Sequence, residues 1–350
     1  MKSVHLVITD LFLPEEFAAA ADVKVSVLEK MLARGASTRL AAIPLENHLC
    51  EMFGVTCQPD TTQVDAPIAP ISAAFDGLAA GCWLRADPVH LHLQRDQMLM
   101  SDVRVSSDEA AEFCAGLNVH FAGQGMEFFA PHPQRWYMRL DALPRIHTTP
   151  LSQVVGGDVR GALPGGEEST RWHQVFNEIQ MLLFAHPLNE AREARGELPI
   201  NSVWFWGCGD VVAPLQRTFH SVSSDDVLAE MFAAAAGVPF SAWSGQWRSS
   251  FSPALSQKEG GFSSEGRQLL VWTGLRSALQ RGDLAAWRTA LQDFESGYAQ
   301  PLWQALCSGK IAQLQIDILS EDNIRRVRLS RGDGWAFWRR AKRLSDYSST

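Results

Sequence analysis

Strand-like and helical segments alternate along the last half of the chain, and this alternation is the feature that most limits its possible folds. The expected strands span residues 200–206, 268–273 and 311–319, and the expected helices between them span 225–236 and 283–307. We expect the last helix to break near Pro301. Strands joined through helices pair in parallel, so the pattern predicts an α/β fold: a mostly parallel sheet with helices on both faces.

A glycine- and proline-rich stretch divides this chain. Residues 148–168 give its best boundary signal, and an alternating strand-like run begins at Cys82. We therefore expect residues 1–80 and 166–350 to form the α/β core, which ends in a basic C-terminal element. Residues 81–165 are expected to form a smaller inserted α+β unit.

Helix-capping residues locate three helices in the first part of the chain. Glycines that follow helical runs predict helices at 18–34 and 45–53. Ser106, with Glu109 three residues later, is typical of a capping box, which predicts a helix that runs to Leu117.

Composition excludes several classes of function. The 350 residues are 46% hydrophobic with a formal net charge of −8, so nucleic-acid binding is not expected. Six cysteines occur without Cys-x-x-Cys spacing, which favours free thiols in a reducing cytosol. The start, MKSVHLVITD, is too short an apolar run for a secretion signal, and no segment reaches the roughly 20 apolar residues of a membrane span. A cytoplasmic location is therefore expected.

The stretch from Arg171 to Asp210 carries the first set of candidate ligand-binding residues. Its strand, Ile200–Trp206, runs into Gly207-Cys208-Gly209-Asp210. A glycine turn after a buried strand is where α/β proteins place ligand sites, because glycine lets the backbone approach a ligand closely. Upstream, His186 and Asn189 share one helical face. We expect Gly207, Gly209, Asp210, His186 and Asn189 to line a pocket.

A second set of candidates lies on two predicted strands. His90 and His92 share one strand face, with Arg85 and Asp87 just before them. Three interpretations stay open for the histidines: a metal pair, an anion pocket with the nearby arginines, or a structural role on a half-solvated strand. Arg135 would complete a phosphate or carboxylate clamp with Arg85, although arginines of this kind more often pair with surface acids.

Five segments resemble a known bacterial family. They are WLRADPVHLHLQRD (83–96), LNVHF (117–121), RWYMRL (135–140), NEIQMLL (177–183) and INSVWFWG (200–207). They look like the RpfE-type regulatory proteins and, more distantly, like the archaeal-type, cofactor-independent phosphoglycerate mutases of the alkaline-phosphatase-like superfamily. The resemblance covers most of the chain. It implies an alkaline-phosphatase-like core that carries an inserted domain.

The resemblance to the mutases also implies two divalent metals, held by Asp and His ligands mostly in the C-terminal half. This chain departs from that pattern, because its last histidine is His220. Trp272 and Leu275 stand where the mutases have an Asp-x-x-x-His step. The later segment QIDILSEDN contains Asp317 but no histidine. Asp10, after the first strand, is either a remnant metal ligand or a loop cap. We expect a degraded metal site and no cofactor, with Mn or Zn only if the chain is an enzyme.

The C-terminal segment from Arg325 to Arg343 contains eight basic residues and one acidic residue, and Trp335, Phe337 and Trp338 lie among them. Basic and aromatic residues together suit an anionic membrane surface, nucleic acid or an acidic partner. The alternative, which we favour, is that the segment packs on the chain's own acidic core.

These observations leave three hypotheses for function. The first is a catalytically degenerate, phosphoglycerate mutase-like regulatory protein that binds a small anionic or phosphorylated ligand, or a protein partner. The second is an active metal-dependent phosphotransferase, mutase or hydrolase with a site rebuilt from His90, His92, Asp87 and Asp10. The third is an interaction protein that makes its contacts through the basic aromatic C-terminal segment.

Overall fold

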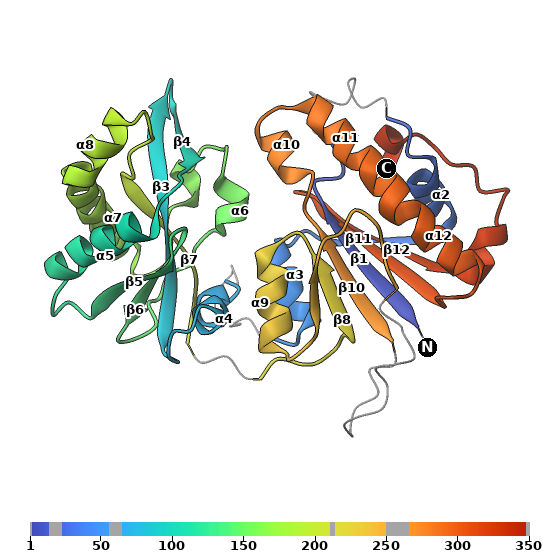
Figure 1. The fold of residues 1–350 in the computed structure, drawn as a ribbon, viewed down its shortest axis with the longest axis horizontal. Coiled ribbons are helices and arrows are strands. Elements are labelled where there is room, and N and C mark those ends of the chain that lie inside the picture. The colour runs from blue at the N-terminus through green and yellow to red at the C-terminus, as the bar shows by residue number, and fades with distance from the viewer. Residues whose placement is uncertain (1, 14–22, 56–64, 211–213, 250–265, 348–350) are drawn as a thin grey trace. The chain divides into compact units, whose positions relative to one another are not determined.

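The computed structural model describes residues 2–13, 23–55, 65–210, 214–249 and 266–347 (Figure 1). The chain divides into two compact units. Unit 1 combines residues 1–53 with residues 216–350, and unit 2 is the continuous stretch 54–215. No helix in the described ranges is both long and apolar enough to cross a bilayer.

Unit 1 is built on a mostly parallel sheet. Seven strands of the described chain form it, in the order β2-β12-β11-β1-β10-β8-β9. β1 pairs in parallel with β10 and β11, and β8 pairs in parallel with β10 and β9, whereas β12 is antiparallel to β11 and β2. The strands are β1 (Ser3–Thr9), β2 (Ala36–Ala41), β8 (Ser221–Ser224), β9 (Phe240–Ala242), β10 (Arg267–Trp272), β11 (Gln313–Leu319) and β12 (Asn323–Ser330). The predicted fold class is confirmed.

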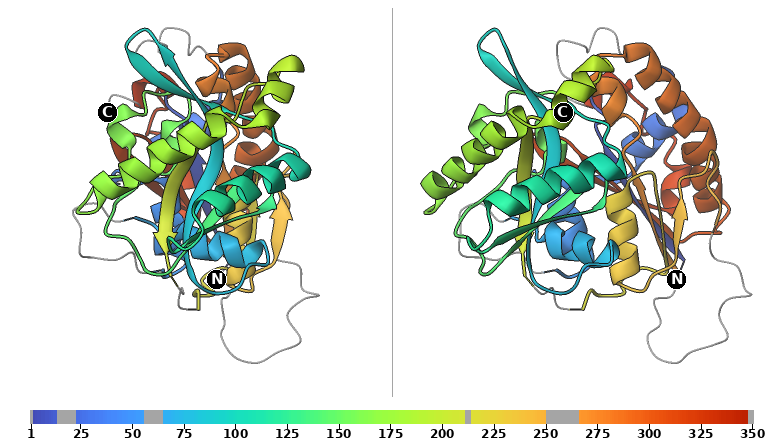
Figure 2. Two further views of the ribbon diagram at one scale, coloured as in Figure 1. Left: turned by 90° about the vertical axis from the view of Figure 1, so that its left-hand side faces the viewer. Right: turned by 60° about the vertical axis from the view of Figure 1, so that its left-hand side comes forward.

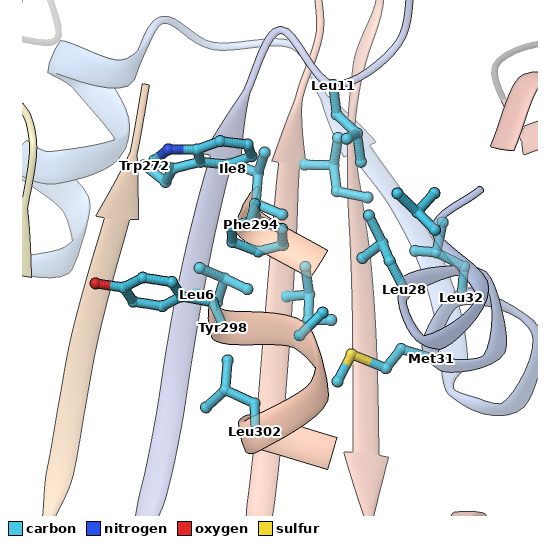
Figure 3. Close-up of a cluster of buried hydrophobic side chains, with 14 of the residues drawn as sticks. Leu6, Ile8, Leu11, Leu28, Met31, Leu32, Trp272, Phe294, Tyr298 and Leu302 are labelled. Atoms are coloured by element: carbon cyan, nitrogen blue, oxygen red, sulfur yellow. The ribbon is translucent and has the colours of Figure 1, made fainter. Parts of the chain in front are cut away.

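One face of this sheet carries the main hydrophobic core (Figure 3). Leu6 and Ile8 of β1 pack with Leu28 and Met31 of α2, and Phe294 lies beside them. The helices of this layer are α2 (Ser26–Arg34), α10 (Arg276–Gln280), α11 (Leu284–Phe294) and α12 (Gln300–Cys307). A π-helical turn, Glu295–Ala299, joins α11 to α12, so the expected break falls just before Pro301.

The opposite face of the sheet carries two further helices, α3 (Leu45–Met52) and α9 (Val227–Ala235). Side chains alternate along a strand, so His5 points away from the face that Leu6 covers. His5 contacts the ring of His48 in α3 and the ring of Phe219. Phe53 links this layer to α9 through its contact with Phe232. Both faces of the sheet are therefore covered.

Unit 2 is built on an antiparallel sheet in which β3 pairs with β4, β6 and β7, and β5 pairs with β6. Its strands are β3 (Cys82–Gln94), β4 (Gln97–Asp102), β5 (Met126–His132), β6 (Arg135–Leu140) and β7 (Ser202–Gly209). Its helices are α4 (Ile68–Phe75), α5 (Ser107–His120), α6 (Leu151–Val154), α7 (Ser169–Phe184) and α8 (Pro187–Ala194), with a 3-10 turn at Arg160–Ala162. The two views of Figure 2 show α5 and α7 on the same side of this sheet.

Two expectations differ from this arrangement. The interpretation of residues 200–206 as a strand of the parallel core was wrong, because β7 pairs antiparallel with β3. The expected boundaries after residues 80 and 165 also differ from those of the two units. α4 packs on β3 and β7, and α7 packs on β7, so 68–75 and 169–184 lie in unit 2.

Most of the expected helices are present at their expected places. Ser106 accepts the amide N–H of Glu109, and the Glu109 carboxylate accepts the N–H of Ser106, so the predicted capping box forms. Of the helix expected at 18–34, the first residues lie outside the described ranges, and α2 begins at Ser26.

Candidate functional site

The carboxyl ends of the parallel strands in unit 1 are the first candidate site, because open α/β sheets bind ligands at this edge. Asp10 directly follows β1 with a left-handed φ of 58°, and Asp225 directly follows β8. A non-glycine residue in that region is uncommon and carries strain. The edge therefore brings two carboxylates from different strands to the same side of the sheet.

Both carboxylates have protein partners. The Asp10 carboxylate accepts from Nε of Arg276, the first residue of α10, at 3.2 Å. The Asp225 carboxylate accepts the backbone N–H of Thr273 at 2.8 Å and its hydroxyl at 3.3 Å. Burial raises the pKa of Asp225 above its usual range, although the bonds from Thr273 oppose the shift. Asp10 thus neutralises a guanidinium, and Asp225 fixes the loop that follows β10.

Trp272 and Leu275, at the same edge, are buried in the hydrophobic core. Neither side chain offers a metal-ligating atom.

A second candidate is a buried cluster on the α3 side of the sheet. Nε2 of His5 lies 2.8 Å from Oδ2 of Asp317, and Nε2 of His48 lies 3.1 Å from the same oxygen. All three residues are at least 97% buried. Of the described residues, these are the ones that bring three potential metal ligands within reach of one another. The set, two imidazoles and one carboxylate, is one that zinc and other transition metals accept.

Arginines already supply positive charge to this cluster. Arg326 binds both oxygens of Asp317 at 2.8 Å, and Arg267 approaches Nδ1 of His5 at 3.4 Å. Burial alone would raise the pKa of Asp317, but hydrogen bonds from His48, His5 and Arg326 outweigh it and hold that pKa far below its usual range. Two guanidiniums beside one carboxylate disfavour a further dication. We interpret the cluster as a buried ion-pair network.

Burial also keeps His5 neutral. It lowers the pKa of His5 below the usual value, and this effect exceeds the opposing hydrogen bond and charge of Asp317. A neutral His5 that accepts from Arg267 through Nδ1 carries its proton on Nε2 and donates it to Asp317. His5 therefore adds no positive charge to the cluster.

In unit 2, the predicted ligand residues Arg85 and Asp87 form a buried ion pair. Nη2 of Arg85 donates to both oxygens of Asp87, at 2.7 and 2.8 Å. The Arg85 guanidinium also lies over the rings of Tyr137 and Trp206, about 5 Å from each centroid. Asp87 further accepts from the indole of Trp206 at 2.7 Å and from the amide of Trp136 at 3.2 Å. The charges of Arg85 and Asp87 are therefore both paired within the protein.

The other predicted polar residues of unit 2 also contact the protein itself. Arg135 binds Asp76 through two nitrogens. His186 caps α8 by accepting the amide N–H of Leu188. Asn189 donates to the carbonyls of Leu183 and Ile200 and accepts the amide of Ile200. The structure gives Arg135, His186 and Asn189 architectural contacts, and their role toward a ligand stays a prediction.

His90 and His92 do share one face, as expected from their spacing. Their rings stack with centroids 5.6 Å apart. Nδ1 of His90 bonds to the carbonyl of Pro199 at 2.9 Å. Nδ1 of His92 is buried without a hydrogen-bond partner among the described residues. The described groups that could hold a metal do not include this pair, so its metal-binding role stays a prediction.

The glycines at the end of β7 serve chain packing. The β3–β7 register slips by one residue between Trp83 and Arg85, which makes a bulge, and Gly207 has a φ of 69° there. Glycine is favoured at such a position because other residues resist positive φ. A Cβ on Gly209 would lie 2.6 Å from Cβ of Pro67. Asp210 follows the strand and is exposed. The chain at this turn therefore approaches the N-terminal end of α4 closely.

Two cysteine thiols also meet beside this bulge, since Cys82 of β3 and Cys208 of β7 hydrogen-bond to each other. Both are free thiols, as the sequence predicts. Cys57 lies outside the described residues.

Replacing Gly209 by alanine is expected to destabilise the protein by about 1–3 kcal/mol, because the new methyl group would overlap the rings of Pro67 and Pro70. Gly161 is the control, since a Cβ there meets no atom within 4 Å. Denaturant midpoints of Gly209→Ala and Gly161→Ala make the comparison. Equal midpoints for the two variants would show that α4 does not need the close approach.

Sequence reasoning missed several of these residues. His5 and Asp317 are 312 positions apart, so no local pattern connects them. Arg276 was also missed, because its partner Asp10 was considered only as a remnant metal ligand or a loop cap. The available signal for Arg276 was its place at the start of a short helix soon after a strand.

Comparison with known proteins gives a consistent but distant similarity. No protein-family model matches the chain. It is 27% identical over 159 residues to a probable 2,3-bisphosphoglycerate-independent phosphoglycerate mutase of Geobacter sulfurreducens, which is 43% of this chain and 39% of the relative. It is 28% identical over 109 residues to such a mutase of Methanosarcina barkeri, 30% of this chain and 27% of that one. The matches span less than half the length of these relatives.

Solved structures resemble the whole chain. The PH0037 protein of Pyrococcus horikoshii matches with a TM-score of 0.54 and 12% identity over 99% of this chain and 92% of that one. A cofactor-independent phosphoglycerate mutase from Thermoplasma acidophilum covers 99% of this chain and 95% of its own, with a TM-score of 0.49 and 15% identity. The chain is thus distantly similar in sequence to phosphoglycerate mutases over part of its length, and its fold resembles that of the PH0037 protein.

Proposed function

We propose that this chain is a phosphoglycerate mutase-like protein that has lost the two-metal site and acts as a regulatory, small-anion-binding protein. The observation that carries this proposal is the ion pair of Asp10 with Arg276 at the carboxyl edge of the parallel sheet. A metal ligand in such a site must offer its carboxylate to a dication. Here the carboxylate faces a guanidinium, which repels a dication and replaces its charge.

The composition of the same edge supports the proposal. A two-metal site requires several carboxylate and imidazole ligands, and the sequence has no histidine after His220. Asp225, the second described carboxylate at the edge, is bonded to Thr273. The described residues at this edge therefore do not fit a pair of divalent metals.

The anion-binding part of the proposal rests on Arg276. Its side chain is 23% exposed and donates to Asp10 through Nε. Arginine binds carboxylates and phosphates through paired N–H groups, so Arg276 is suited to an anionic ligand that competes with Asp10 for its guanidinium. The regulatory part rests on the resemblance to the RpfE-type proteins. The relatives are named as phosphoglycerate mutases, so phosphorylated three-carbon acids are the first ligands to test.

Purified protein is expected to contain far less than one divalent ion per chain and to show no phosphoglycerate mutase turnover. The measurement is elemental analysis of protein made without chelator, with manganese and zinc supplied, followed by a mutase assay. A mutase with its metal site intact, carried through the same purification, is the control. One or two firmly held ions per chain would overturn the degenerate-site proposal.

The enzyme alternative has one observation in its favour, the buried His5, His48 and Asp317 set. If metal is found, His48→Gln and His92→Gln separate the two possible centres, because each removes one imidazole from one cluster. Loss of metal only in His48→Gln would place it in unit 1. Loss only in His92→Gln would favour a site rebuilt from His90 and His92.

3-Phosphoglycerate is expected to raise the melting temperature of the wild-type protein and not that of Arg276→Gln, since a ligand that binds only the native state stabilises it. Arg281→Gln is the matched control, because Arg281 is exposed and lies just beyond α10. An equal rise in melting temperature in all three proteins would show that the anion binds away from Arg276. Absence of any shift, with inorganic phosphate as well, would remove the anion-binding part of the proposal.

A further inference from the structure

A basic aromatic loop in unit 1, residues 335–343, is held at both ends. Before it, Ser330 and Asp333 form a capping box on the 3-10 turn Arg331–Trp335. The carbonyl of Gly334 accepts from Nη1 of Arg34 at 2.7 Å. After it, Leu344 and Tyr347 are buried in the hydrophobic core. The loop is therefore fixed at its ends and does not depend on a partner for its position.

The first part of this loop exposes three large aromatic side chains. Trp335, Phe337 and Trp338 are 74%, 76% and 69% exposed, whereas Ala336 between them is 5% exposed. Exposing so much contiguous apolar surface is unfavourable in water and marks interaction sites. Of the segment Arg325–Arg343, the first residues pack on the core as part of β12, as preferred, whereas these three aromatic residues do not.

Basic side chains surround the aromatic ones. Arg331, Arg339, Arg340 and Lys342 are exposed, and Arg339 is oriented by a hydrogen bond to the carbonyl of Arg34 at 2.7 Å. Residues 335–343 contain four basic and no acidic residues, whereas the chain as a whole has a formal net charge of −8. An anionic surface would attract this face and repel the rest of the molecule.

We propose that the basic aromatic loop, residues 335–343, docks the protein peripherally on an anionic lipid bilayer. Tryptophan and phenylalanine beside arginine and lysine are the combination that enters the boundary between headgroups and acyl chains. Side chains about 70% exposed protrude from the surface. Protruding rings require matching pockets on a protein partner, whereas a fluid bilayer accepts them without one. This inference is independent of the proposed anion site.

The test is co-sedimentation of the full-length protein with vesicles. Phosphatidylcholine vesicles are compared with vesicles that also contain phosphatidylserine. The wild type is expected to bind the anionic vesicles at least about tenfold better and to dissociate as salt rises, because salt screens surface charge. A Trp335→Ser/Phe337→Ser/Trp338→Ser variant is expected to lose this binding, and Arg340→Gln/Lys342→Gln to weaken it.

Phe184→Ser is the matched control, since Phe184 is 83% exposed but lies on α7 in unit 2. It is expected to bind like the wild type. Circular dichroism checks that each variant is folded. Wild-type binding by the triple variant, or no preference for anionic lipid, would overturn the proposal. Tighter binding to duplex DNA than to anionic vesicles, lost in the same variants, would assign the loop to nucleic acid instead and equally reject the membrane.

Discussion

Replacing Asp87 by alanine is expected to destabilise unit 2 by about 3–5 kcal/mol, the range for breaking a buried ion pair by removing one partner. The Asp87 side chain is 1% exposed and accepts hydrogen bonds from Arg85, Trp206 and the amide of Trp136. Its loss would leave the Arg85 guanidinium buried without a counter-ion. The measurement is the free energy of unfolding from denaturant titration.

Asp96→Ala is the control for this variant, since Asp96 is exposed in the turn that follows β3. A change within about 0.5 kcal/mol is expected there. The comparison also decides between two roles for Asp87. If Asp87→Ala unfolds as readily as the control but loses an anionic ligand, the residue belongs to a binding pocket, as the sequence suggested.

Replacing Asp317 by asparagine is expected to destabilise unit 1 by about 3 kcal/mol, the lower end of the range for a buried ion pair. Asp317 is fully buried and is bonded to His5, His48 and Arg326. The lower value is appropriate because the Arg326 side chain is 21% exposed, so water can partly solvate its charge when the pair is broken. An amide would also place N–H donors against the donors of Arg326.

The exposed Asp322 provides the control, as Asp322→Asn, and unfolding free energies are compared at neutral pH. Equal stability of the two variants would contradict the interpretation of the cluster as an ion-pair network. A metal-dependent loss of stability in Asp317→Asn alone would instead support a metal centre.

The same cluster should make stability depend on pH. The pKa of His5 is lowered in the folded state by burial, so the unfolded chain binds the proton more readily. Stability is then lost as pH falls below about 6.5, the unfolded value for histidine. The pKa of Asp317 is also lowered, and its contribution is kept until the pH falls below about 4. Between about pH 7.5 and 5.5 the cluster's share of the loss therefore comes from His5, beside a contribution from His132, whose pKa burial also lowers. The loss in this window should be smaller in His5→Gln.

The fold class followed from the sequence because it depends on local signals. Strand and helix periods, the Ser106 capping box and the glycine that follows α3 all act within a few residues of the chain. The sheet to which β7 belongs does not follow from such local signals. Its residues are apolar on both faces, and such a run suits a parallel or an antiparallel neighbour equally. Only the pairing with β3, far away in sequence, decides it.

The candidate site was harder to predict because a charged residue does not show its partner. Arg85 and Asp87 are two residues apart on one face of the same strand, so an ion pair between them could have been predicted in place of a ligand site. The ion pair of Arg276 with Asp10 could not be predicted in this way, since the two residues meet only when β1 and β10 pair. Long-range pairs of this kind decide whether a conspicuous side chain faces a ligand or its own protein.

The N-terminus of α2 also depends on a distant residue. The carboxylate of Glu295, in the π-helical turn, accepts the amides of Val27 at 2.6 Å and Leu28 at 3.1 Å. β1 likewise finds its neighbours only in β10 and β11. During synthesis, unit 2 is complete in the emerging chain while β1 and α2 still lack their partners. The sheet of unit 1 can therefore close only after β10 and β11 have been synthesised, and until then the apolar face of β1 lacks its neighbours.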